Sequence, residues 1–350
     1  MLIANTIKMK HTFWFIFLIL SSCQMTGKND NPFSVITQFP VEEELTAEVI
    51  SIPPIAMTPF NIFTTEDKLV MYNLQKDSIF DVFSLPECNY LFSAGYKGEG
   101  PNDFMDVDRR LFVPTKNGFK VFFQSHKELK EVQFRDKSIE VVKDSILKFE
   151  IDQYPVNGFT PLNDSIFIYW SGFGKETEYD LLNRNTKEII PFSPYPEWAK
   201  QENAERLFTY IKNMTVKPDG KGFAAFYGYF KRFRIYDDKG NLLKDISLEI
   251  EPYASDFETE VNSRMVYYFA YPKSSNEYIY ALCKNAKADA EAIPELQIWR
   301  WDGTPVGKYK LDRHITLFSI SEKYEKMYAV NGENEEEIYV FSLPKEVKFK

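Results

Sequence analysis

The chain has 350 residues, a net charge of −9 and 16% aromatic residues, including 31 Phe and 21 Tyr. The acidic balance and the lack of a Lys/Arg cluster argue against a nucleic-acid-binding protein, because binding phosphates needs a concentrated basic face. A composition of 44% hydrophobic and 27% charged residues is typical of a globular protein, and the many aromatic residues favour strands.

The first 23 residues, MLIANTIKMKHTFWFIFLILSSC, have the pattern of a signal peptide. Two lysines precede an apolar run over residues 13–20, which is too short to cross about 30 Å of hydrocarbon as a helix. The run ends in Leu-Ser-Ser-Cys, which resembles the lipobox of bacterial lipoproteins and implies cleavage before Cys23 and lipidation of its thiol. A buried strand with an incidental cysteine is the alternative, and translation starting at Met1 or at Met9 fits equally well.

These features predict a signal peptide over residues 1–22, a flexible polar tether over 23–32 and one domain over 33–350. Residues 1–22 contain two lysines and no acidic residue, so the mature protein has a net charge of −11. We therefore expect an exported, acidic lipoprotein at the cell envelope, on either leaflet of the outer membrane.

From about residue 55 onward, short apolar runs alternate with Asn, Asp, Gly and Lys, which is the pattern of many short strands. One unit recurs: a strand ending in a large apolar residue, a tight polar turn, and a second strand. Its six copies end their first strand at Phe83, Phe134, Leu182, Tyr236, Trp301 and Phe341. Two further strands precede each of these hairpins, so we predict an all-β, six-bladed β-propeller of four-stranded blades, lettered A to D along the chain.

The sixth unit ends too close to Lys350 for a full D strand, whereas an N-terminal segment, residues 33–41 or 44–50, has no blade of its own. We expect an N-terminal strand to complete the sixth blade and close the ring, which removes an open sheet edge. A seven-bladed ring would need a seventh hairpin, and a β-sandwich would not explain the repeat.

The segment GYKGEGPNDF, residues 95–104, follows strand D of the first blade and is predicted to be a crossover between blades. Gly95, Gly98 and Gly100 permit positive φ, Pro101 fixes the chain direction, and Phe104 is expected to pack between the blades. A phosphate-binding loop would need a Gly-Lys-Ser/Thr sequence opening a helix, which is missing here.

This segment resembles the Gly-x-Gly-Pro-Gly-Glu-Phe motif of the TolB-like six-bladed propeller lipoproteins of Bacteroidetes, with Asn102 and Asp103 in place of the motif's Gly and Glu. Together with the lipobox and the six units, the resemblance covers nearly the whole mature chain. It implies an architecture and a cellular address, but no reaction.

Because strands alternate in direction, the B–C loops and the crossovers between blades lie on one face, and the A–B and C–D turns lie on the other. The long segments all belong to the first face, which we predict to be the binding surface. The candidate binding residues there are Tyr96, Asp103, Phe173, Tyr195, Trp198 and Tyr253.

Two long segments on that face are expected to form short helical insertions, over residues 197–212 and, more weakly, 254–264. In the first, Ala204, Leu207, Phe208 and Ile211 form an apolar stripe. The helix either covers the central channel as a lid or packs on the rim.

Catalytic constellations are scarce. Only His126 and His314 remain after signal cleavage, which leaves few residues for a metal site or a Ser-His-Asp triad. The acidic run 333–337 is expected to be a solvated B–C loop and lacks the ligand spacing of a calcium loop. We predict no catalytic residue, no metal and no cofactor.

The two remaining cysteines are predicted to be free thiols. Cys88 falls in the C–D turn of blade 1 and Cys283 at the end of strand B in blade 5, on opposite faces of non-adjacent blades. A disulfide needs Cα atoms within about 7 Å of each other.

Two functions remain open, and the sequence does not decide whether the protein is an enzyme. The first is a non-catalytic binding or scaffold protein that holds a glycan, a peptide or a protein on the long-loop face, with no nucleic acid and with the membrane contacted only through the anchor. The second is an envelope hydrolase or lyase that uses carboxylates and a tyrosine at the channel mouth.

Overall fold

The structure is a computed structural model that describes residues 31–54, 58–98, 100, 102–124, 128–146, 156–171, 175–199, 206–254, 256–334 and 336–347. The chain divides into two compact units, Met1–Asn31 and Pro32–Lys350, and the second holds every described strand. Predictions about Cys23, Pro101, His126 and Phe173 lie outside the described residues.

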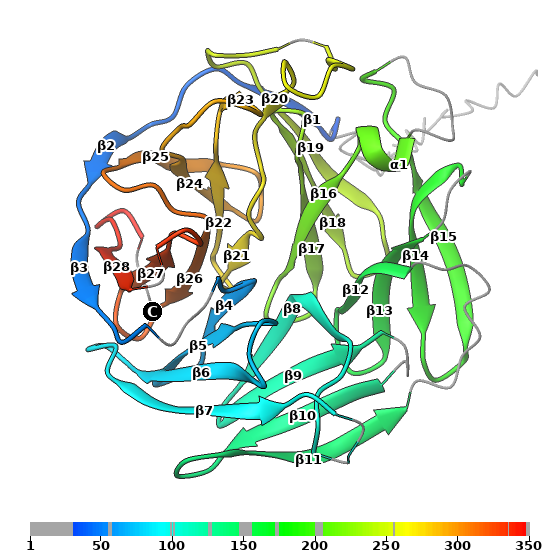
Figure 1. Cartoon of the computed structure of the whole chain (residues 1–350). Helices are drawn as coiled ribbons and strands as arrows, with labels where there is room; N and C mark the ends of the chain where they lie inside the picture. The colour runs from blue at the N-terminus through cyan, green and yellow to red at the C-terminus, as the bar shows by residue number, and fades with distance from the viewer. Residues whose placement is uncertain are drawn as a thin grey trace, which may run out of the picture. The chain divides into compact units, whose positions relative to one another are not determined.

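The strands of Pro32–Lys350 form six blades in a ring around a channel, as predicted (Figure 1). The first three blades are β4 (Asn61–Thr64), β5 (Lys68–Tyr72), β6 (Ser78–Ser84) and β7 (Tyr90–Tyr96); β8 (Val107–Thr115), β9 (Gly118–Phe123), β10 (Glu128–Phe134) and β11 (Ile139–Ile146); and β12 (Val156–Pro161), β13 (Ile166–Ser171), β14 (Thr177–Asn183) and β15 (Glu188–Pro194).

The other blades are β16 (Lys212–Val216), β17 (Gly222–Tyr227), β18 (Arg232–Asp237) and β19 (Leu242–Leu248); β21 (Lys273–Ser274), β22 (Tyr278–Cys283), β24 (Glu295–Arg300) and β25 (Pro305–Leu311); and β26 (Leu317–Ser321), β27 (Lys326–Val330) and β28 (Glu337–Ser342). A separate ribbon pairs β20 (Met265–Val266) with β23 (Ala286–Lys287). The six predicted hairpin anchors all lie within, or directly after, strand C of their blades.

An N-terminal strap, residues 33–51, runs along the outside of three successive blades (Figure 1). Its strand β1 (Phe33–Ile36) pairs in parallel with β19, and β2 (Glu42–Leu45) pairs in parallel with β25. Strand β3 (Glu48–Ser51) then pairs antiparallel with β28 and completes the sixth blade. The predicted closure by an N-terminal strand is confirmed, and the fourth and fifth blades each gain a fifth strand that the sequence did not indicate.

Between β1 and β2 the strap is fixed to the body by an aromatic side chain. Phe39 is buried and meets the ring of Trp299 edge-on, with centroids 5.0 Å apart. Burying a large aromatic ring is strongly favourable, so this contact anchors the strap between its two parallel strand pairs.

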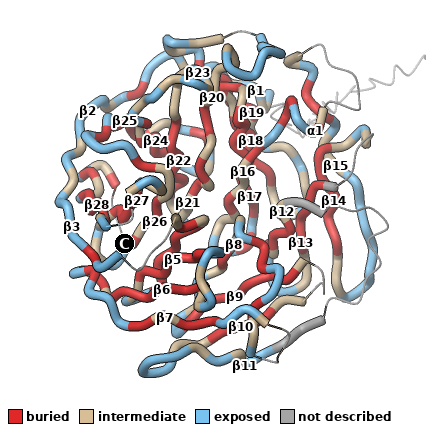
Figure 2. Tube along the Cα trace, in the orientation of Figure 1, coloured by how far each residue is buried: buried red, intermediate tan, exposed pale blue. Residues whose placement is uncertain are grey.

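Each blade packs its faces against its neighbours, and the strap stays at the surface. The middle strands are almost fully buried, for example β17 and β22, in which every residue is buried (Figure 2). By contrast, no residue of β2 or β3 is buried. No helix of the described residues has the length and apolar character needed to cross a bilayer.

The segment at residues 97–106 is a crossover between blades, as predicted. Phe104 is buried and packs on Phe80 of the first blade and on Phe123 of the second, with ring centroids 5.3 and 5.8 Å apart. Gly95 has the expected positive φ of 76°, whereas Gly98 and Gly100 do not. These two glycines instead make room for the carboxylate of Asp103, which accepts a hydrogen bond from the Gly100 amide at 2.9 Å.

Of the two predicted helical insertions, the first contains a short helix, with residues 200–205 outside the described residues, and the second is not helical where it is described. The only helix among the described residues is the four-residue α1 (Arg206–Thr209), and residues 254 and 256–264 form bends, irregular chain and one turn at 261–263. Of the predicted stripe, Leu207 is buried but Phe208 is 61% and Ile211 40% exposed, while Ala204 lies outside the described residues. The apolar residues therefore do not share one buried helical face.

Both described cysteines are buried free thiols at the predicted positions. Cys88 lies in the turn between β6 and β7, and Cys283 ends β22. Burial raises the pKa of the Cys88 thiol to about 12, which keeps it protonated and unreactive at neutral pH.

A buried ionic cluster joins the third and fourth blades. Glu178 of β14 accepts hydrogen bonds from Lys212 at 2.6 Å, from Arg234 at 3.0 Å and from the Tyr227 hydroxyl at 2.9 Å. Arg234 also pairs with Asp245 at 3.0 Å. Because each charge has an opposite partner, this cluster links two blades without leaving a buried charge unpaired.

We expect Glu178→Gln to destabilise the protein by about 3–5 kcal/mol, because Lys212 and Arg234 would lose a buried partner. Glu176→Gln is the matched control: its carboxylate is 72% exposed and pairs with Arg206, a contact worth about 1 kcal/mol or less. Equilibrium unfolding in urea measures both, and equal losses for the two variants would contradict the role of the cluster.

We also expect the strap to be required for ring closure. Removing residues 1–53 takes away β3 and exposes the edge of β28, so the midpoint of thermal unfolding should fall and the protein should aggregate. Removing residues 1–31 leaves all three strap strands and should change the midpoint little. Similar midpoints for the two truncations would show that the ring closes without β3.

Candidate ligand-binding site in the central channel

One end of the central channel opens into a cavity of about 490 Å³. It is bounded by the last residues of the six innermost strands and by the turns that follow them. The strands are β4, β8, β12, β16, β21 and β26. The cavity therefore lies on the face of the A–B and C–D turns, which we call the turn face; the opposite face, with the B–C loops and crossovers, is the loop face.

Lys273 of β21 is the central charged residue of this cavity. Its Nζ donates hydrogen bonds to the side-chain oxygen of Asn61 at 3.3 Å and to the backbone oxygen of Ile62 at 3.0 Å. Both acceptors belong to β4 of the first blade, so the side chain reaches past the sixth blade. The Asn61 amide in turn donates to the Arg109 backbone oxygen at 2.7 Å, which extends the connection to the second blade.

The charge of Lys273 is not balanced by a carboxylate. Among the ion pairs of the described residues none involves Lys273, and desolvation lowers the pKa of its amine to about 8. A lysine can donate three hydrogen bonds, and two have partners here. One donor and an uncompensated charge therefore remain at a cavity large enough for a ligand.

Hydroxyl groups line the cavity beside this amine. Thr64 and Ser319 hydrogen-bond to each other at 3.1 Å, and Thr215 and Ser274 do so at 2.9 Å. All four residues border the cavity and come from four different blades. The Thr64 and Ser274 hydroxyls donate to the backbone oxygens of Ile320 and Val216, so the wall presents hydroxyl oxygens that can accept hydrogen bonds from a hydroxylated ligand.

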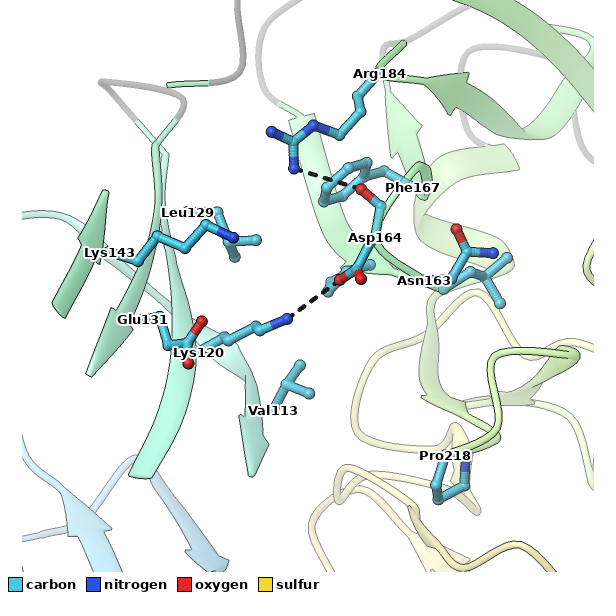
Figure 3. A pocket seen from close by; sticks show the side chains of 12 residues that line it. Val113, Lys120, Leu129, Glu131, Lys143, Asn163, Asp164, Phe167, Arg184 and Pro218 are labelled. Carbon is cyan, nitrogen blue, oxygen red and sulfur yellow. Dashed lines mark hydrogen bonds and ion pairs between the residues drawn. The ribbon is translucent and has the colours of Figure 1, made fainter. Parts of the chain in front are cut away.

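A second cavity, of about 210 Å³, lies between the second and third blades on the same face (Figure 3). In it Lys120 pairs with Asp164 at 3.4 Å, and Arg184 donates to the backbone oxygen of Asp164 at 3.4 Å. Four residues border both cavities: Val113, Pro161, Leu162 and Pro218. The groove between the blades thus continues the channel cavity outward.

The residues predicted for binding lie elsewhere, on the loop face. Trp198 packs on Tyr227 and Phe230, with ring centroids 4.7 and 5.2 Å apart, and on the Arg232 guanidinium at 4.0 Å. Tyr195 is buried in the same cluster. Because these partners belong to strands B and C of the fourth blade and the loop between them, the segment packs on the rim and is not a lid over the channel.

The other loop-face candidates do not join this cluster into one pocket. Tyr96 is 61% exposed at the end of β7. The carboxylate of Asp103 accepts a hydrogen bond from the Gly100 amide of its own loop. Tyr253 is half-buried, and burial of Arg232, the main cause, lowers the pKa of that guanidinium, with a small opposing effect of Tyr253. The structure brings Tyr195 and Trp198 together, with Tyr253 nearby, and keeps Tyr96 and Asp103 apart from them.

Sequence analysis missed Lys273 altogether. The only available indication was a lysine followed by two serines, YPKSSN, next to a short innermost strand. Long connections do occupy the loop face as predicted, with residues 195–211 and 249–272 the longest, but the larger cavity is on the turn face.

The sequence analysis left open an enzyme with carboxylates at the channel mouth. The carboxylates that border the channel cavity are Glu66 and Glu322, in the turns at its mouth, and Glu66 pairs with Lys323 at 3.8 Å. His314 is exposed between the fifth and sixth blades. Within the described residues, no three His, Cys, Asp or Glu side chains gather in a way that could hold a metal ion.

Two solved structures share this architecture. One, a member of the DUF4221 family from Bacteroides vulgatus, is 13% identical, with a TM-score of 0.57 over 85% of this chain and 97% of the other. The second, a candidate exported protein from Bacteroides fragilis, is 10% identical, with a TM-score of 0.54 over 89% of this chain and all of the other. At these identities the likeness shows the fold alone.

None of the curated proteins compared with the chain matches it. The sequence profile described as "TolB-like 6-blade propeller-like" matches residues 39–323, from the aromatic anchor of the strap to the A–B turn of the sixth blade. The match spans most of the chain and agrees with the six blades observed, so the chain belongs to the TolB-like 6-blade propeller-like family.

Proposed function

We propose that this protein is an exported, lipid-anchored binding protein that holds a ligand in the channel cavity on its turn face without transforming it. The observation that carries the proposal is the cavity itself. Its volume of about 490 Å³ falls within the range of about 300–1,000 Å³ that is usual for small-molecule sites. It is bordered by residues from rigid strands of all six blades, which favours a site formed before the ligand arrives.

The lining supports a polar ligand such as a glycan or a peptide. Serine and threonine hydroxyls from four blades offer hydrogen bonds, and the adjoining groove between the second and third blades gives an extended ligand room to continue. This places the proposed site on the face opposite to the one predicted from loop length.

The lining also favours binding over hydrolysis or elimination. Glycoside hydrolysis needs two carboxylates about 5–10 Å apart across the scissile bond. At the channel cavity the two bordering carboxylates sit in mouth turns, and one of them pairs with a lysine. An envelope hydrolase or lyase remains the alternative that the experiment below distinguishes.

Export and anchoring are supported by the N-terminal sequence, with its short apolar run and Leu-Ser-Ser-Cys ending, and by the name of the similar Bacteroides fragilis protein. An anchor at Cys23 would join the body through about ten residues ahead of β1. The propeller would then be held close to the membrane surface.

We expect Thr115→Trp to abolish ligand binding, because Thr115 ends β8 at the cavity and an indole there fills the mouth. The full-length protein would be applied to an array of neutral and acidic glycans and peptides, and signals should fall at least about tenfold, as expected when a bulky side chain fills a site. The control is Thr186→Trp, an exposed C–D turn residue of the third blade on the same face. Equal binding by Thr115→Trp would place the site elsewhere, and turnover of a bound glycan would favour the enzyme.

We expect wild-type protein to incorporate a palmitate analogue during growth and Cys23→Ala to incorporate none, because only the thiol accepts the diacylglycerol group. Two or more acyl chains give stable membrane attachment, so the wild type should sediment with membranes and the variant should not. Cys88→Ala is the control, since that thiol is buried in the folded body. Equal labelling of Cys23→Ala would refute the lipobox assignment.

A further inference from the structure

Lys273 differs from the other buried cations of this protein in its surroundings. Lys212 and Arg234 face the Glu178 carboxylate, and Lys231 is enclosed in the body with two backbone oxygens as acceptors. Lys273 has only an amide oxygen and one backbone oxygen, yet it borders a large open cavity. Its charge is therefore desolvated by the protein without a carboxylate partner among the described residues, at a residue that forms part of the cavity wall.

We propose that Lys273 is the recognition residue for an oxyanion group, a carboxylate or a phosphate or sulfate ester, carried by a hydroxylated ligand of the channel cavity. This inference rests on the proposed binding function and adds the chemical class of the ligand. A charge-assisted hydrogen bond from Nζ to an anionic oxygen would supply the counter-charge that the described residues do not provide.

The neighbouring groups fit such a ligand. Asn61 holds the lysine in place through its side-chain oxygen, and its own amide is fixed by the Arg109 backbone oxygen. In the Thr64–Ser319 and Thr215–Ser274 pairs, the Thr64 and Ser274 hydroxyls donate to the backbone oxygens of Ile320 and Val216, so the pairs present oxygens that accept hydrogen bonds from hydroxyl groups of the ligand. An acidic sugar combines these features in one small molecule.

Other charged groups facing the cavity do not neutralise Lys273. Arg110 of β8 borders the cavity and pairs with Asp108 at 2.9 Å. The remaining ones stand in the turns at the mouth: Glu66 and Lys323, which pair with each other, Glu322, and Lys217, which pairs with Asp219. Arg110, Lys217 and Lys323 each have a carboxylate partner, so their charges are balanced by the protein itself, and within the described part of the chain Lys273 is the cation of the wall that has no such pair.

The lowered pKa of Lys273 makes binding depend on pH. Below about 8 the amine is charged and binds an anion; above about 8 it is neutral and loses that attraction. By linkage, an anion that binds the charged form must raise the pKa of Lys273. Affinity for acidic ligands should therefore fall as the pH rises above about 8, while affinity for neutral ligands should not.

The experiment uses full-length protein in detergent, labelled biosynthetically with lysine that carries ¹³C at Cε, so that the amine and its hydrogen bonds stay unmodified. The Lys273 signal is identified by its loss in Lys273→Gln, and its titration is followed by NMR. We expect a pKa near 8 that rises when glucuronate, glucose 6-phosphate or glucose 6-sulfate is added and does not rise with glucose. Comparing the three acidic sugars shows whether the site prefers a carboxylate, a phosphate ester or a sulfate ester.

Binding of the same sugars is then measured by calorimetry at pH 6.5 and 9.5. We expect Lys273→Gln to lower the affinity for the preferred acidic sugar by about tenfold or more at pH 6.5, the size typical of a hydrogen bond to a charged group. The variant should also bind this sugar with an affinity that no longer depends on pH. Lys116→Gln is the matched control, because Lys116 is an exposed turn residue on the same face that borders neither cavity. Circular dichroism confirms that both variants are folded.

The proposal is overturned if no acidic sugar raises the pKa of Lys273, or if Lys273→Gln binds acidic sugars as tightly as the wild type. In that case Lys273 is a structural link between blades, and its variant should only lower the unfolding midpoint. Failure of the proposed function has a different signature: no ligand, neutral or acidic, would then be blocked by Thr115→Trp.

Discussion

The closure of the ring by β3 is the constraint on which the rest of the structure depends. A propeller of six blades buries its faces only if the last blade packs against the first, and the sixth blade has just three strands of its own near the C-terminus. Pairing of β3 with β28 supplies the fourth strand from the opposite end of the chain. The innermost strands then meet around the channel, and their ends form the cavity.

This closure also explains why the cavity is well defined despite its short turns. Its lining residues lie at the ends of paired strands, whose positions are fixed by the neighbouring blades. The hydrogen bonds of Lys273 and Asn61 join the fifth, first and second blades across the channel. Sites carried by strands are generally more precise than sites carried by loops.

The loop face has a different organisation. Its long connections fold back on the body, where Trp198 covers Tyr227 and Phe230 above the cluster of Glu178, Lys212 and Arg234. The long connections on this face therefore cover the junction between the third and fourth blades and its buried charges. A long loop is therefore no evidence of a binding surface in this protein, although loops often carry function in others.

The blades could be predicted from the sequence because their determinants are local. Tight turns such as DKGN and DGTP lie between strands of alternating residues, and Gly240 and Gly303 adopt φ of 83° and 85° in them. Closure could be predicted because the sixth unit lacked a strand. The extra pairings of β1 and β2 could not, because a parallel strand added to an outer edge leaves no pattern of its own in four residues.

The predicted helical stripe and the predicted binding site were not confirmed, and the reasons are physical. Apolar residues at helical spacing suggested a buried stripe, but Phe208 and Ile211 are exposed, so spacing alone did not indicate burial. The role of Lys273 could not be predicted from the sequence, because it depends on which side chains of the innermost strands face the channel. It also depends on a contact with Asn61, which is 212 residues away in the chain. Such a contact is fixed by the register of six blades and not by any local motif.

The strap has a mechanical consequence as well. Tension applied at the N-terminus would reach β1 first, then β2, and only afterwards β3, because the three strands follow one another along the chain. Strands β1 and β2 would first have to separate from β19 and β25, and the Phe39 side chain from Trp299. Only then would the force act on the pairing of β3 with β28, which closes the propeller. The fourth and fifth blades thus protect the pair that closes the ring, because a pull on the chain ahead of β1 separates their strap strands first.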